Sequence, residues 1–217
     1  MVNRIRFSGK EISHLIISVF IMSSLVAINM VAGAGNFLTG KGFSFESFLI
    51  SVLFFIPFAT IIIVPAFVLH EMGHKFTAQK FGFWAEYRMW TQGLLLAILI
   101  TVLTRGQFLF IAPGAVYFAP HGFLTTAAKE KIGKIGLSGP VINLFLGVAF
   151  GLLSLLIVEE LWSAIFAIGA SANAFLAIFN LIPFAPLDGE KIFVWDKKIW
   201  ASAIVLAIML FGFLAFA

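Results

Sequence analysis

Five long runs of apolar residues constrain the fold of this chain more than any other feature. They lie at residues 15–31, 48–69, 135–158, 161–182 and 199–217. A helix that crosses a bilayer needs about 17 to 25 mostly apolar residues, and each run meets or approaches that length. With 61% hydrophobic and 11% charged residues, the chain lies well above the roughly 45 to 50% apolar usage of soluble domains. The sequence predicts an all-α polytopic membrane protein.

A sixth apolar region, residues 94–118, is too interrupted for another full span. Arg105 and Gly106 divide it, and its uncharged first part corresponds to about 15 Å of helix. The second part, residues 108–118, combines aromatic and β-branched residues with Pro113, which is typical of extended chain with a turn. We expect about five full transmembrane helices plus a re-entrant or hairpin segment with short membrane-associated β structure.

The sequence shows no boundary between domains. No soluble domain, long linker or internal repeat is evident, so residues 1–217 are expected to form a single transmembrane domain. Its core is expected at about residues 48–195, with additional helices at 11–33 and 199–217.

The basic residues predict which segments face the cytoplasm. All Lys and Arg except Lys41 and Arg105 fall in four clusters that flank apolar runs: Arg4/Arg6/Lys10, Lys75/Lys80/Arg88, Lys129/Lys131/Lys134 and Lys191/Lys197/Lys198. Positively charged segments stay in the cytoplasm, so we expect the four clusters and the N-terminus on that side of the lipid bilayer. No cluster is dense enough to follow a phosphate backbone, which argues against nucleic acid as a partner.

A short polar motif, residues 70–74, directly follows the second apolar run. On a helix, positions i and i+4 lie on one face, so His70 and His74 can bind one ion with Glu71 beside them. In this H-E-x-x-H pattern two imidazoles hold zinc, and the unligated carboxylate acts as general base on a zinc-bound water. The alternative is a chance match with both histidines hydrogen-bonded in a helix bundle. The cost of burying Glu71 without a function weighs against that alternative.

A third zinc ligand is needed, and the absence of cysteine limits it to His, Asp or Glu. Pro183 and Pro186 must disrupt the end of the run at 161–182, and we expect Asp188 in the irregular chain that follows. Asp188 immediately precedes a basic cluster, which predicts the same side and a similar depth to the two histidines. The alternative is a helix-end carboxylate paired with Lys191.

Asn143 is a further polar residue at membrane depth, within a segment rich in small residues at 136–147. It can simply bond to a neighbouring helix. In an active site it can instead hold the substrate backbone or the oxyanion of a tetrahedral intermediate.

Three motifs thus occur in order along the chain: His70-Glu71-Met72-Gly73-His74, Gly139-Pro140-Val141-Ile142-Asn143, and Asn180-Leu181-Ile182-Pro183 followed by Leu187-Asp188-Gly189. Over about residues 50–195 the chain resembles the site-2 protease family of intramembrane zinc metalloproteases, in a short form without a PDZ or nucleotide-sensing domain. The resemblance implies that Zn2+ is bound by His70, His74 and Asp188. It also implies that Glu71 activates water and that Asn143 assists in the site.

The resemblance further implies an endopeptidase that uses a metal-activated water to cut peptide bonds within or next to transmembrane segments of membrane-protein or peptide substrates. An extended segment after the zinc helix would guide the substrate strand, which makes Ala115, Val116 and Tyr117 the expected substrate-binding residues. The family often has a second glycine after Asp-Gly, where this chain has Glu190. The alternatives are a divalent-metal transporter or metal-binding membrane protein without protease activity, and an inactive relative.

Overall fold

The computed structural model describes residues 6–33, 44–109, 113–119 and 126–216. Within this part of the chain, five helical segments are long and apolar enough to cross a membrane, and a single small two-stranded sheet is present. The prediction of an all-α polytopic membrane protein is therefore confirmed. The chain divides into two compact units, one comprising residues 1–7, 65–86 and 116–217 and the other residues 8–64 and 87–115.

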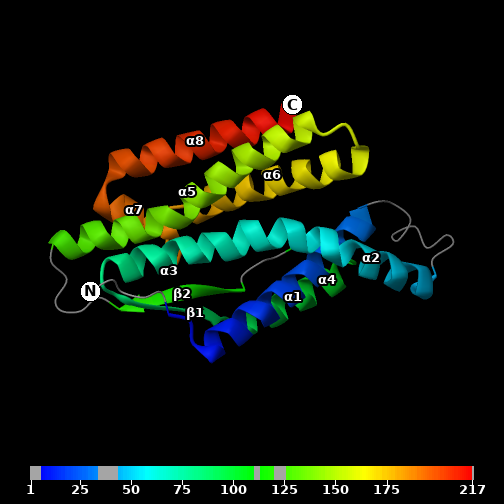
Figure 1. Ribbon diagram of the computed structural model, residues 1–217, viewed down its shortest axis with the longest axis horizontal. Coiled ribbons are helices and arrows are strands. Elements are labelled where there is room, and N and C mark those ends of the chain that lie inside the picture. Colours follow the sequence, from blue (N-terminus) through cyan, green and yellow to red (C-terminus); the bar gives the residue numbers. More distant parts are fainter. Residues whose placement is uncertain (1–5, 34–43, 110–112, 120–125, 217) are drawn as a thin grey trace. The chain divides into compact units, whose positions relative to one another are not determined.

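The first unit is built around α5 (Thr126–Leu156). Packed against α5 are α3 (His70–Lys80), α6 (Glu160–Asn180), α7 (Asp188–Trp195) and α8 (Lys197–Phe216) (Figure 1). Small residues such as Ala177, Ala203 and Ala207 form much of the buried core between α6 and α8. Small side chains allow the close approach of helices that membrane-embedded packing requires.

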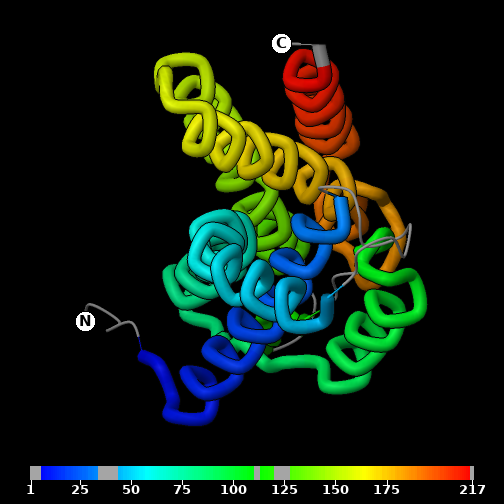
Figure 2. The backbone as a smooth tube through the Cα atoms, turned by 90° about the vertical axis from the view of Figure 1, so that its right-hand side faces the viewer, coloured from blue at the N-terminus to red at the C-terminus, as the bar shows by residue number. Residues whose placement is uncertain are grey.

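The second unit contains α1 (Gly9–Gly33), α2 (Phe45–Ile63) and α4 (Thr91–Leu103). Helix α1 packs alongside both α2 and α4, and Figure 2 shows α1 and α2 next to each other in blue. At 13 residues, α4 is too short to span a bilayer by itself.

A π-helical segment, η1 (Val64–Leu69), joins α2 to α3. Pro65 lies at its start, and a proline removes a backbone donor and crowds the preceding turn. The segment Phe45–Lys80 is continuous over 36 residues, about 54 Å at 1.5 Å per residue. It therefore exceeds the roughly 30 Å hydrocarbon core of a bilayer, and the H-E-x-x-H motif lies on a helix, as the sequence analysis expects.

The region at 94–118 combines a short helix with extended chain, as the sequence predicts. Helix α4 covers its first part, and β2 (Gly114–Ala119) pairs with β1 (Trp84–Met89), a strand that the sequence did not predict. Two side chains of α1 bond to the end of β1 that lies in the same unit: Tyr87 N–H donates to Glu11 Oε1 at 2.9 Å and Met89 N–H donates to His14 Nδ1 at 3.2 Å. These contacts satisfy backbone donors that a sheet edge otherwise leaves unpaired.

The expectation that Asp188 lies in irregular chain is wrong in one respect. Helix α6 ends at Asn180 and residues 181–187 are not helical, but Asp188 is the first residue of α7. A carboxylate is favourable in the first turn of a helix because it faces unpaired N–H groups. The helix can therefore restart directly after the prolines.

Candidate metal centre and active site

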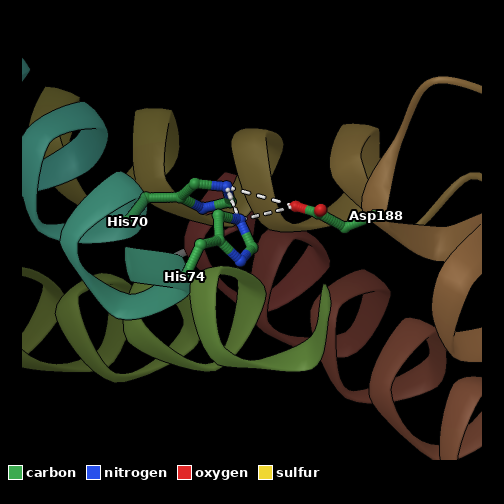
Figure 3. A group of neighbouring side chains, drawn as sticks. All are labelled: His70, His74 and Asp188. Atoms are coloured by element: carbon green, nitrogen blue, oxygen red, sulfur yellow. Dashed lines mark hydrogen bonds and ion pairs between the residues drawn. The ribbon is translucent and has the colours of Figure 1, made fainter. Parts of the chain in front are cut away.

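Three buried side chains of the first unit converge on one point. His70 and His74 project from α3 and Asp188 from α7 (Figure 3). The two Nε2 atoms are 3.0 Å apart, and Asp188 Oδ2 lies 3.3 Å from His70 Nε2 and 2.8 Å from His74 Nε2. The structure thus brings together the three residues predicted as metal ligands, and this group can hold a metal ion.

The donor set and its spacing fit zinc. Two imidazole nitrogens and one carboxylate oxygen are a common catalytic zinc set, and ligands about 2.0 to 2.1 Å from a tetrahedral ion lie roughly 3.3 Å from one another. Gly139 of α5 faces the rings, and a Cβ built there would lie 2.6 Å from His70 Nε2. Any residue other than glycine at position 139 would therefore displace the two imidazoles.

His70 is oriented by Asn143. His70 Nδ1 donates to Asn143 Oδ1 at 2.5 Å, and Asn143 Nδ2 donates to Ala66 O at 2.8 Å and to Asn173 Oδ1 at 2.9 Å. A hydrogen bond at Nδ1 fixes the imidazole tautomer and leaves Nε2 as the nitrogen that can bind a metal. The structure places Asn143 behind the His70 ring, with both ends of its amide engaged by protein groups.

His74 is oriented by the backbone of α5. Its Nδ1 donates to Ile135 O at 2.7 Å, and Ser138 Oγ donates to the same carbonyl at 2.6 Å. Both imidazoles therefore present Nε2 to the same point.

Asp188 divides its two oxygens between different partners. Oδ2 faces the histidines, and Oδ1 accepts from Lys191 Nζ at 2.8 Å. Burial alone would raise the pKa of the Asp188 carboxyl, but attraction to His74 and Lys191 outweighs it and holds the pKa well below its usual range. The Lys191 pairing that the sequence offered as an alternative is present together with the histidine contacts. Glu190 on the same helix is exposed.

Gly189 is required directly after the carboxylate. A Cβ at this position would overlap the carbonyl oxygens of Leu181 and Ile182. The Asp-Gly pair therefore allows the start of α7 to pack closely on the chain that leaves α6.

Glu71 is buried beside the two histidines on α3, and its Oε2 accepts the Val116 N–H of β2 at 2.9 Å. Among the residues predicted to bind substrate, Val116 is thus in contact with the predicted general base. Tyr117 is 59% exposed, and Ala115 is also exposed. Their role in substrate binding stays a prediction.

Several residues that support the site lie outside the ligand positions. Asn173 on α6 holds Asn143, Gly139 leaves room for the rings, and Lys191 holds Asp188. Asn173 and Lys191 fall outside the three sequence motifs. Of these supporting contacts, only that between Lys191 and Asp188 could be predicted from the sequence, because the two residues are three positions apart on one helix.

Comparison with known proteins finds curated relatives that are named as zinc metalloproteases. "Putative zinc metalloprotease MJ0611" of Methanocaldococcus jannaschii is 35% identical over 214 residues, covering 97% of this chain and 96% of that protein. "Putative zinc metalloprotease YwhC" of Bacillus subtilis is 28% identical over 68% of this chain and 72% of its own length. "Putative zinc metalloprotease Rip2" of Mycobacterium tuberculosis is 33% identical over 56% of this chain and 50% of its own. No family model matches, and no solved structure gives a significant match.

The membrane-spanning fold, the His-His-Asp group and these relatives define a zinc metalloprotease of a multi-pass membrane class. The chain belongs to the site-2 protease family. The resemblance inferred from the three motifs is therefore confirmed, and zinc is the metal cofactor that the relatives and the donor set indicate. The transporter alternative is not favoured.

Proposed function

We propose that this protein is an intramembrane endopeptidase that hydrolyses peptide bonds within or next to transmembrane segments of membrane proteins. One observation carries the proposal: a buried His70, His74 and Asp188 group lies beside a buried, unligated Glu71 in a chain of membrane-spanning helices. Intramembrane ionisable residues are costly and mark functional sites by default. Zinc held by the three ligands would supply Lewis-acid polarisation of the reacting groups.

Glu71 is the proposed general base. Its carboxylate takes a proton from the attacking water as the water oxygen bonds to the peptide carbonyl carbon. It then returns that proton to the amide nitrogen as the C–N bond breaks, which leaves a carboxyl and an amine product. The Val116 N–H holds the Glu71 carboxylate in one orientation. Asn143 is proposed to act through His70, as a positioning residue.

The substrate is proposed to bind as an extended strand along β2. Peptide bonds in a helix are shielded, so a transmembrane segment must unwind before water reaches them, and strand addition supplies backbone partners for the unwound chain. The N–H of Val116 points to Glu71, so a substrate strand beside this part of β2 would lie close to the general base. Ala115 and Tyr117 are exposed neighbours that can contact substrate side chains.

The metal site is proposed to lie near the cytoplasmic face, with a cytoplasmic N-terminus that falls outside the described residues. Lys80, Lys197 and Lys198 flank the site in sequence and are exposed, as expected of cytoplasmic basic residues. The chain has no cysteine, so single cysteines at Lys80, Lys197 and Glu159 report on topology directly. The first two should label from the cytoplasmic side and the third from the other. Labelling of Lys80 and Lys197 from opposite sides contradicts the proposal.

The Glu71→Gln variant tests the function. Glutamine keeps an oxygen that can accept from Val116 N–H, so the local fold and zinc content should remain. The assay uses proteoliposomes containing a set of single-span membrane proteins, with mass spectrometry of the products. We expect cleavage within or next to the span by the parent protein, and a rate at least about 100-fold lower in the variant. Equal cleavage by both proteins, or cleavage only in soluble regions far from the span, contradicts the proposal.

A further inference from the structure

We propose that Lys191 is a positioning residue of the metal centre, holding one oxygen of Asp188 so that only the other faces the metal position. The inference rests on the proposed zinc site of His70, His74 and Asp188. It assigns a role to a residue that none of the three motifs contains.

The two oxygens of Asp188 have separate partners. Oδ2 is 2.8 Å from His74 Nε2 and 3.3 Å from His70 Nε2, whereas Oδ1 is 2.8 Å from Lys191 Nζ. Asp188 begins α7 and Lys191 follows at i+3 on the same helix, a spacing at which side chains are neighbours. The pair therefore forms within one turn.

The Lys191 side chain is itself confined. It is 29% exposed, and its Nζ lies 5.7 Å from the ring centroid of Phe118 on β2. Phe118 in turn stacks on Phe83, with centroids 6.4 Å apart and planes 17° apart. On the other side, a Cβ built at Gly136 of α5 would lie 3.1 Å from Lys191 Cβ. An ammonium with restricted access to water holds a carboxylate more firmly than a solvated surface lysine does.

Each of the three proposed zinc ligands has one protein partner that holds it, and Lys191 is the partner of the third. His70 is held by Asn143 and His74 by Ile135 O, and the third ligand, Asp188, is held by Lys191. Partners of this kind orient metal ligands, and their loss typically costs 10- to 100-fold in metal affinity. Without the ammonium, Asp188 can rotate and exchange its oxygens, and the negative charge on Oδ1 is no longer compensated.

The test compares zinc affinity, by chelator competition in detergent, among four variants of the full chain. Lys191→Met keeps the apolar stem and removes the charge, and Lys191→Gln is a second neutral variant of similar length. Lys191→Arg keeps the charge. The matched control is Lys197→Met, because Lys197 is exposed and lies 5.1 Å from the Phe193 ring without contacting a ligand.

We expect both neutral variants to bind zinc about 10- to 100-fold more weakly, with arginine restoring most of the loss and the Lys197 variant unchanged. The visible spectrum of the Co2+ form should change in the neutral variants alone, because the coordination of Asp188 changes. Parent-like affinity in the neutral variants, or equal weakening by arginine, overturns the inference. Absence of zinc binding in the parent protein would instead refute the proposed function, so the two failures are distinguishable.

Discussion

Replacement of Gly139 by alanine should damage the metal centre without altering any ligand. Gly139 lies on α5 against both imidazoles, and an added Cβ would lie 2.6 Å from His70 Nε2 and from His70 Cε1. Ordinary van der Waals contact begins at 3.4 Å. Either the rings or the helix must therefore move by several tenths of an ångström.

The rings have little freedom to move while they hold a metal. His70 is tied to Asn143 at 2.5 Å and His74 to Ile135 O at 2.7 Å, both through Nδ1. Forcing extra volume into a packed site costs about 1 to 3 kcal/mol. A ring that turns away relieves the contact only by breaking its Nδ1 hydrogen bond and moving Nε2 from the metal position, so much of the cost falls on metal binding. At about 1.4 kcal/mol per factor of ten, we expect zinc affinity to fall by roughly 5- to 150-fold.

The assay is zinc affinity by chelator competition, with Gly147→Ala as the control. Gly147 lies on the same helix, and its added Cβ would meet Leu210 Cδ2 at 2.9 Å, the end of a flexible side chain. The control should bind zinc like the parent protein. If Gly139→Ala also binds zinc with parent affinity, the two rings do not occupy the positions described, and the reasoning fails.

Three further predictions concern the support of His70, the stability of the second unit and the dependence of proteolysis on zinc. Asn143→Ala removes the partner of His70 Nδ1 and should weaken zinc binding about 10- to 100-fold; an unchanged dissociation constant would remove its positioning role. Tyr87→Phe removes buried hydrogen bonds to Ser18 Oγ at 2.9 Å and Pro113 O at 3.0 Å and should lower the free energy of unfolding by about 1 to 3 kcal/mol. Thermal unfolding measures that loss, and unchanged stability argues against the bonds. Treatment with a zinc chelator should abolish proteolysis and added zinc should restore it, whereas activity that persists in zinc-free protein contradicts metal-dependent catalysis.

The membrane-spanning helices and the pairing of the two motif histidines could be predicted from sequence because each depends on a local pattern. The spans follow from uninterrupted apolar length, and the pairing of His70 with His74 follows from helical spacing. Asp188 required the additional argument that basic residues place it on the same side as the histidines. The proximity of all three residues agrees with that argument.

The groups that hold the candidate ligands were harder to predict from sequence, because they depend on which side chains the packed helices bring together. The sequence does not show which end of the Asn143 amide faces His70. The positions of Ala66 O and Asn173 Oδ1, which accept from Nδ2, decide this. Strand β1 is only six residues long and carries Glu86 and Arg88 among its apolar residues, so its strand pattern is weak. Two of its backbone donors, those of Tyr87 and Met89, bond to side chains of α1, a contact between distant parts of the sequence that no local pattern records.

Zinc content measured by elemental analysis tests the central claim most directly. The comparison is between the purified parent protein, the Asp188→Ala variant and the Glu190→Ala control, which removes an exposed carboxylate from the same helix. We predict about one zinc per chain in the parent and the control, and little in the Asp188 variant, because a catalytic zinc site needs three protein ligands. Equal zinc in all three proteins, or none in the parent after reconstitution, would contradict a zinc centre formed by His70, His74 and Asp188.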